Sequence, residues 1–203
     1  MLLVIDSATA ACSAALFDDD GELIDERHET VGRGHAERLV PMIAELLAGR
    51  RPQAILVDCG PGSFTGLRVG IAAAHGLAIG WGVPLSGYSS MALLAAASGE
   101  APVGVALTGG HGEAFVQSFG NDPLAPLDTL RSLAPQEAAA AIGAELVVGS
   151  AAQALVALRG HGRAVDALPR AADAGLLPSS LRTLAPRPIY GRAPDAKPAA
   201  GGV

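Results

Sequence analysis

The chain has 203 residues, of which 50% are hydrophobic and 17% charged, so a globular unit of two small lobes is expected and wholesale disorder is excluded. Aromatic residues make up only 3% and the formal net charge is −6. Both values disfavour binding of nucleic acid by this chain alone, whether through base stacking or through neutralised phosphates.

The N-terminus and the cysteines predict where the protein works. No basic segment precedes the apolar run at residues 2–5, so a signal peptide is not expected, and no uncharged apolar stretch is long enough to span a membrane. Cys12 and Cys59 form no C-x-x-C pair, which favours a reducing compartment. We therefore expect a cytoplasmic protein without a membrane partner.

The first half of the chain predicts a mixed sheet covered by helices. Runs of apolar residues separated by turn residues predict antiparallel strands, and apolar residues recurring every three or four positions from His35 predict an amphipathic helix. In chain order, the predicted elements are strands at 2–5, 13–17 and 23–24, a helix from His35 to about Gly49, a strand at 54–57, a helix from Gly66 to about Gly80, a strand near Leu85 and a helix at 91–94.

The same order of elements then begins again. The second half predicts a hairpin from 103–107 and 114–119, a helix at 135–142, a strand at 146–148 and a helix at 151–158. The expected fold is α/β with two lobes of similar plan: an N-terminal lobe over 1–98, a smaller C-terminal lobe over 99–192, and a flexible tail over 193–203.

A glycine-rich segment over residues 60–70 joins a predicted strand to a predicted helix. It is not a P-loop, because Leu67 follows Gly66 where that motif has lysine, and it does not match G-x-G-x-x-G. One interpretation is a tight turn in which Ser63 or Thr65 caps the helix and Arg68 lies in solvent. The other is a retained anion contact at the helix N-terminus.

The turn after the first strand is a second candidate site. Asp6, Ser7 and Thr9, together with Gly62 and Ser63 of the glycine-rich segment, are the candidate residues of a vestigial nucleotide-binding cleft. The alternative is hydrogen bonding within a turn, which such residues commonly make. No catalytic residue is predicted, and no metal site, since the residue four positions after His35 is Leu39 and two imidazoles cannot share that helix face.

Three segments carry a family resemblance: residues 5–16, residues 35–42 and the glycine-rich residues 60–70. Together they resemble the TsaB (YeaZ) family of bacterial accessory subunits for threonylcarbamoyladenosine formation in tRNA. Residues 112–116 resemble the hairpin of the family's second lobe, and residues 188–192 its C-terminal P-x-Y-x-R motif. The turn at 108–110 departs from the family, which tends to carry D-A-R there.

The resemblance implies the fold shared by actin, sugar kinases and heat-shock ATPases (ASKHA), with two ribonuclease-H-like lobes of mixed sheets and helices. It implies a non-catalytic subunit required by a TsaD-type catalytic subunit and joined by a TsaE-type ATPase, because the H-x-x-x-H metal motif of the catalytic relative is missing here. It also implies contact with tRNA only through the complex, no cofactor in the isolated chain since ATP and metal belong to partner subunits, and a homodimer as one state of the chain alone.

The partner is expected to dock on two helices of the first lobe. The helix from His35 has an apolar stripe, and the helix from Gly66 is rich in small residues that allow close approach. The candidate partner-binding residues are His35, Arg38, Leu39, Met42, Ile43, Leu46, Arg68, Val69, Ala72, Ala73 and Gly76. The alternative is that both stripes pack on the chain's own core.

Two enzymatic hypotheses remain beside the accessory role. The first is a nucleotide-binding transferase or hydrolase that acts through its own cleft, with Asp6, Ser7 and Gly62 as working residues. The second is a metallopeptidase of the M22 type, a class to which this superfamily has been assigned.

Overall fold

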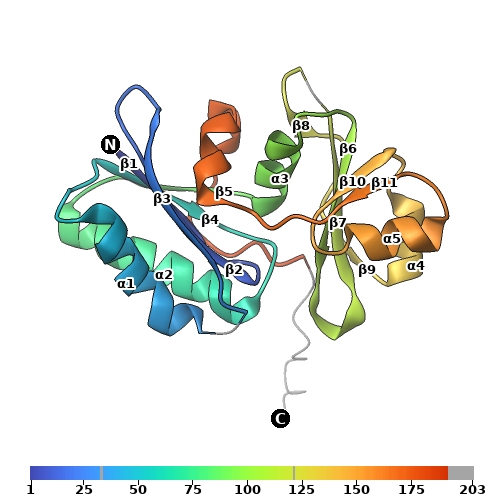
Figure 1. The fold of residues 1–203 in the computed structure, drawn as a ribbon, viewed down its shortest axis with the longest axis horizontal. Coiled ribbons are helices and arrows are strands. Elements are labelled where there is room, and N and C mark those ends of the chain that lie inside the picture. The colour runs from blue at the N-terminus through green and yellow to red at the C-terminus, as the bar shows by residue number, and fades with distance from the viewer. Residues whose placement is uncertain (33, 121, 192–203) are drawn as a thin grey trace, which may run out of the picture.

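The computed structural model describes residues 1–32, 34–120 and 122–191, which form two lobes lying side by side (Figure 1). The predicted tail over 193–203 and Arg192 of the P-x-Y-x-R motif lie outside the described residues. In the described part, every helix is too short or too polar to cross a membrane.

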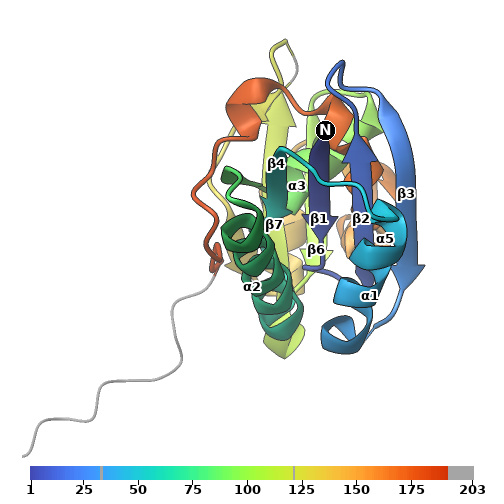
Figure 2. The same cartoon turned by 90° about the vertical axis from the view of Figure 1, so that its left-hand side faces the viewer.

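The first lobe is a five-stranded mixed sheet in the order β3-β2-β1-β4-β5. The three strands of the N-terminal meander pair antiparallel, whereas β4 pairs parallel with both β1 and β5. Helices α1 and α2 lie side by side on one face of this sheet (Figure 2). The elements are β1 (Leu2–Asp6), β2 (Ala11–Phe17), β3 (Leu23–Thr30), α1 (His35–Leu47), β4 (Ala54–Asp58), α2 (Phe64–Trp81), β5 (Leu85–Tyr88) and α3 (Ser90–Ser98).

The second lobe repeats this plan. Its sheet has the order β11-β10-β6-β7-β8, with β9 also paired to β7, so an antiparallel hairpin again continues into parallel strands. This shared strand order confirms the predicted α/β architecture of two ribonuclease-H-like lobes. The elements are β6 (Val103–Thr108), β7 (Ala114–Gly120), β8 (Ala125–Pro126), β9 (Arg131–Leu133), α4 (Pro135–Ala141), β10 (Leu146–Val148), α5 (Ala152–Arg159) and β11 (Arg163–Val165), with short 3₁₀ helices η1 (Gly110–Gly112), η2 (Ala171–Leu176) and η3 (Ser179–Leu181).

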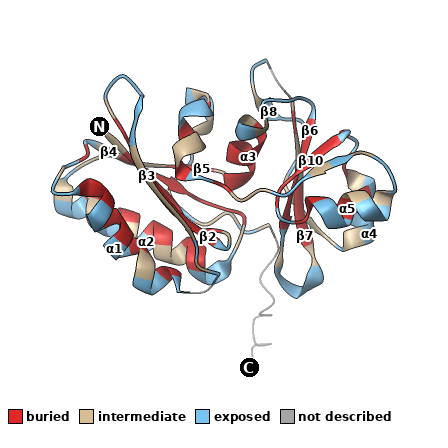
Figure 3. Ribbon diagram, viewed as in Figure 1, coloured by how far each residue is buried: buried red, intermediate tan, exposed pale blue. Residues whose placement is uncertain are grey.

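The hydrophobic core has three layers, because strand side chains alternate between the two faces of each sheet. In β1, Leu3 and Ile5 face α1 and α2, whereas Val4 faces the other lobe. The central layer between the two sheets includes α3 and residues of η2, and a third cluster lies under α4 and α5. Figure 3 shows the buried sides of the helices turned towards the sheets.

The segment after β11 returns to the first lobe. The backbone N–H of Ala171 donates to the Ser13 hydroxyl on β2 at 2.9 Å, and Arg170 forms an ion pair with Glu26 on β3. Further on, Leu184 pairs with Gly87 at the edge of β5. The predicted second lobe over 99–192 therefore ends in a segment that packs against the first lobe.

Candidate functional site

The glycine-rich segment packs directly against the turn between β1 and β2. Ser63 caps α2 by accepting a hydrogen bond from the N–H of Gly66 at 3.2 Å, and its own N–H donates to the carbonyl of Ala8 at 2.5 Å. A Cβ atom on Gly62 would lie 2.0 Å from the Ala8 carbonyl oxygen, and one on Gly66 would lie 2.2 Å from the Ser7 carbonyl oxygen. These glycines are therefore needed for close approach of two backbones, and the capped-turn interpretation describes this segment.

The candidate nucleotide-binding hydroxyls are used inside the same turn. The Ser7 hydroxyl is buried and donates to the carbonyl of Gly66 at 2.9 Å. The Thr9 hydroxyl accepts from the N–H of Ala11 at 3.2 Å. The start of α2 therefore occupies the space against this turn, and both hydroxyls have partners within the protein.

Asp6 is the one candidate of this group that carries a charge, and it is fully buried. Its Oδ2 atom accepts a hydrogen bond from the Tyr88 hydroxyl at 2.8 Å. Burial raises the pKa of Asp6 to about 6, against the lowering effect of Tyr88 and of the Ala8 backbone. Asp6 thus lies beneath the turn and within the protein interior.

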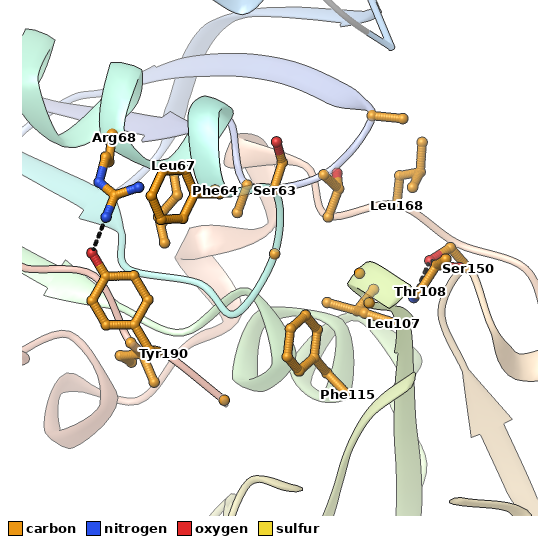
Figure 4. Close-up of a pocket in the computed structure, with 18 of the residues that line it drawn as sticks. Ser63, Phe64, Leu67, Arg68, Leu107, Thr108, Phe115, Ser150, Leu168 and Tyr190 are labelled. Carbon is orange, nitrogen blue, oxygen red and sulfur yellow. Dashed lines mark hydrogen bonds between the residues drawn. The ribbon is translucent and has the colours of Figure 1, made fainter. Parts of the chain in front are cut away.

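A cleft of about 880 Å³ lies between the two lobes, within the usual size of ligand pockets. Phe64 and Leu67 of α2 line one wall, and Leu107, Thr108 and Phe115 of the second-lobe hairpin line the other (Figure 4). Most of the lining is apolar, and its hydroxyl groups are those of Thr9, Ser63, Thr108, Ser150 and Tyr190.

Arg68 stands at one end of this cleft. Its guanidinium lies 3.1 Å from the centre of the Phe64 ring, and its Nη2 donates to the Tyr190 hydroxyl at 2.7 Å (Figure 4). The expectation that Arg68 lies in solvent is therefore wrong, because the C-terminal segment supplies a partner that the local sequence does not reveal. Tyr190 belongs to the P-x-Y-x-R segment noted in the sequence.

The apolar stripe of α1 does not face outward. Leu39, Met42, Ile43 and Leu46 are almost completely buried against the first sheet. His35 is also buried, with Nε2 at 3.2 Å from the Ala11 carbonyl oxygen. The prediction that these five residues contact a partner is wrong: the stripe packs in the chain's own core, because the sheet needs an apolar cover.

Arg38 forms two ion pairs within the first lobe. It pairs with Glu29 on β3 and with Glu45 on α1, at 2.6 and 2.9 Å. The two carboxylates raise the pKa of Arg38, and they leave its guanidinium engaged between two elements of its own lobe.

A different apolar surface is exposed on the outer sides of α1 and α2. Of the predicted partner-binding residues on α2, Ala72 and Gly76 are exposed, and Val69 and Ala73 are half-buried. Sequence reasoning missed Val40, which is 55% exposed on α1, and Ile79, which is 80% exposed on α2, since neither lies on a predicted stripe. We define the docking face as Val40, Ala44, Val69, Ala72, Ala73, Gly76 and Ile79.

Comparison with known proteins gives consistent matches. The family model TsaD, tRNA N6-adenosine threonylcarbamoyltransferase, matches residues 27–183. The tRNA threonylcarbamoyladenosine biosynthesis protein TsaB of Escherichia coli is 38% identical over 99 residues, which are 46% of this chain and 42% of that protein. The Haemophilus influenzae protein of the same name is 40% identical over 104 residues, 49% of this chain and 43% of that protein.

A solved structure matches almost the whole chain. It is a Pseudomonas aeruginosa protein described as similar to the peptidase YeaZ, with a TM-score of 0.77 and 27% identity over 94% of this chain and 99% of that chain. The curated relatives, in contrast, are matched over less than half of their length. Among the described residues, no three His, Cys, Asp or Glu side chains are grouped so that they could hold a metal ion.

Proposed function

The chain belongs to the TsaD family of tRNA N6-adenosine threonylcarbamoyltransferases, on its TsaB (YeaZ) branch, and on this premise we propose that it is a non-catalytic subunit of the machinery that transfers threonylcarbamoyl to adenosine in tRNA. Its partner in this role is a TsaD-type catalytic subunit, and a TsaE-type ATPase joins the pair. Contact with tRNA comes only through the complex, and the work takes place in the cytoplasm, where the tRNA is.

The docking face is the observation that carries this proposal. Ile79 and Val40 expose apolar side chains on neighbouring helices, although the core beneath α1 and α2 is already filled. The small exposed residues Ala72 and Gly76, on the turns of α2 that precede Ile79, allow the backbone of a partner helix to approach closely. A large apolar side chain buried in such a contact contributes roughly 1.5–3 kcal/mol.

Two further features support an accessory role. His35 packs on the Ala11 carbonyl in the interior, and the residue one turn later is the buried Leu39. The Ser7 hydroxyl, a candidate phosphate contact, donates instead to the Gly66 carbonyl at the start of α2, although Thr9 of the same turn lines the cleft. The chemistry is therefore assigned to the partner and the docking to this chain.

The first experiment reconstitutes the reaction. The purified chain is mixed with its TsaD-type homologue, its TsaE-type ATPase, tRNA and substrates, and the modified adenosine is measured with and without the chain. We expect modification to require the chain. An unchanged yield when it is omitted would contradict the proposed role.

The second experiment tests the docking face itself. We expect Ile79→Glu to weaken binding to the TsaD-type subunit at least tenfold, because the charge would be desolvated in the interface, while the isolated variant stays folded. Leu158→Glu is the matched control, since Leu158 is 50% exposed on α5 of the other lobe. Equal affinity of both variants, measured by calorimetry, would refute this surface.

Light scattering of the chain alone addresses self-association. If the free protein is a dimer through the docking face, Ile79→Glu should convert it to a monomer and Leu158→Glu should not. A dimer that survives Ile79→Glu would place self-association on another surface.

A further inference from the structure

Three polar side chains lie in a row at the ends of three neighbouring strands. The register of β1 and β4 pairs Ile5 with Val57, so the next position places Asp6 beside Asp58, and Asp58 pairs in turn with Tyr88 on β5. All three are at most 2% exposed. We call Asp6, Asp58 and Tyr88 the polar row.

The polar row faces the layer between the two sheets. Val4 and Leu56, two positions before Asp6 and Asp58, belong to the core cluster of that layer, as does Tyr88 itself. Residues two positions apart on a strand share a face. The two carboxyl groups therefore lie on the same side of adjacent strands, which are about 4.8 Å apart.

Hydrogen bonds satisfy only half of the carboxyl oxygens. Oδ1 of Asp58 accepts from the N–H groups of Gly60 and Ser90, at 2.8 and 3.0 Å. Oδ2 of Asp6 accepts from the Tyr88 hydroxyl. Asp6 Oδ1 and Asp58 Oδ2 are both buried without a hydrogen-bond partner, and two ionised carboxylates could offer each other only acceptors.

No cationic side chain in the described part of the protein compensates this pair. Within residues 1–32, 34–120 and 122–191, neither carboxyl group forms an ion pair with an arginine, a histidine or the N-terminus. The other titratable groups that interact with the pair are neutral ones: burial raises the pKa of Tyr88 well above 10 and that of Cys59 to about 12, and it raises the pKa of Cys12 to about 11. Burial, and then the charge of Asp6, raises the pKa of Asp58 well above its usual value.

We propose that Asp58 is held as a carboxylic acid at neutral pH and that its Oδ2–H donates to Oδ1 of Asp6. This single proton gives a partner to both unsatisfied oxygens and leaves Oδ1 of Asp58 free to accept from Gly60 and Ser90. Asp58 is then a positioning residue, which joins the first strand to the glycine-rich segment and to the N-terminus of α3. The inference concerns the isolated chain and does not depend on the proposed function.

A proton held on Asp58 makes the stability of the folded protein depend on pH. The pKa of Asp58 is higher in the folded than in the unfolded state, so the carboxyl group favours folding most at pH values below its unfolded pKa of 3.8. As the pH rises from there towards the folded pKa, the folding equilibrium constant falls by up to tenfold per pH unit for this one proton. Asp6 adds a smaller effect of the same sign below about pH 6.

Asp58→Asn tests the proposal, because the amide keeps an acceptor for Gly60 and Ser90 and supplies an N–H donor to Asp6. The folding equilibrium constants of both proteins are measured by denaturation at pH 5, 6, 7 and 8. We expect the ratio of the D58N constant to that of the unmodified protein to increase by up to tenfold for each pH unit. Asp20→Asn, at an exposed turn, is the control and should leave the curve parallel. A D58N curve parallel to that of the unmodified protein would overturn the proposal.

The unmodified protein gives an independent reading that does not depend on the folding of a variant. The carboxyl carbon of Asp58, observed by ¹³C NMR in the purified chain, should show the chemical shift of a carboxylic acid at pH 7. A carboxylate shift at that pH, or an acid shift at Asp6 in its place, would refute the assignment. Neither result would bear on docking or on tRNA modification.

Discussion

At the scale of single residues, the same amino acid has different effects at different positions of α2. A side chain on Gly66 would overlap the Ser7 carbonyl, whereas a Cβ on Gly76 meets nothing within 4 Å. The first glycine is needed because two backbones meet there, and the second lies on the open docking face. Composition alone shows a helix rich in glycine, and only the fold separates the two roles.

Gly66→Ala is therefore expected to destabilise the protein by about 1–3 kcal/mol, since the new methyl group must push α2 away from the turn after β1. Gly76→Ala should instead stabilise by about 0.5–1 kcal/mol, because it lowers the entropy of the unfolded chain in an open helical position. Urea denaturation of both variants measures the difference. A G66A variant as stable as G76A would show that the close approach is not rigid.

The polar row shows the limit of sequence reasoning at this scale. Asp6 could be singled out because it ends an apolar run, but nothing in the local sequence singles out Asp58, which follows the predicted strand at 54–57, or Tyr88, near the strand predicted at Leu85. Their meeting depends on β1, β4 and β5 being neighbours, with more than twenty residues between each pair along the chain. No local signal records that adjacency.

At the scale of elements, hydrophobic periodicity predicted α1 well, the helix predicted from Gly66 corresponds to α2, and the long strands of both hairpins are present. It could not say what each apolar stripe packs against, and the stripe of α1 packs on its own sheet. The strands that were missed, β8, β9 and β11, contain only two or three residues and, unlike the equally short β10, no run of buried apolar side chains.

Met42 and Val40 provide a test of the two sides of α1. Met42 is fully buried, so Met42→Ala should cost about 2–5 kcal/mol through the cavity it leaves. Val40 is 55% exposed, so Val40→Ala should change stability by no more than about 0.5 kcal/mol. Thermal denaturation of both variants distinguishes them, and a mild effect of M42A would place that side chain at a surface after all.

At the scale of the whole molecule, the lobes are held together by more than the helix between them. The segment after β11 crosses back, and its first anchor is the buried bond from the Ala171 N–H to the Ser13 hydroxyl. The ion pair of Arg170 with Glu26 beside it is more exposed, with the Arg170 side chain 54% accessible. This return could not be predicted from the sequence, because the segment has no hydrophobic periodicity.

Ser13→Ala should therefore destabilise the molecule by about 1–3 kcal/mol, since it leaves the buried N–H of Ala171 without an acceptor. Arg170→Ala should cost no more than about 1 kcal/mol, as is usual for an exposed ion pair. Hydrogen exchange at the Ala171 amide is the direct measurement. Unchanged protection in S13A would mean that the return segment is held by other contacts.

The return segment also sets an order of events during translation. Strand β5 is made early, but its edge at Gly87 is covered by Leu184. The carbonyl of Cys59, after β4, accepts a hydrogen bond from the N–H of Ile189. A chain that ends at residue 165 contains the strands of both sheets but lacks the residues that cover these positions. The lobe that is synthesised first is thus the one that is finished last.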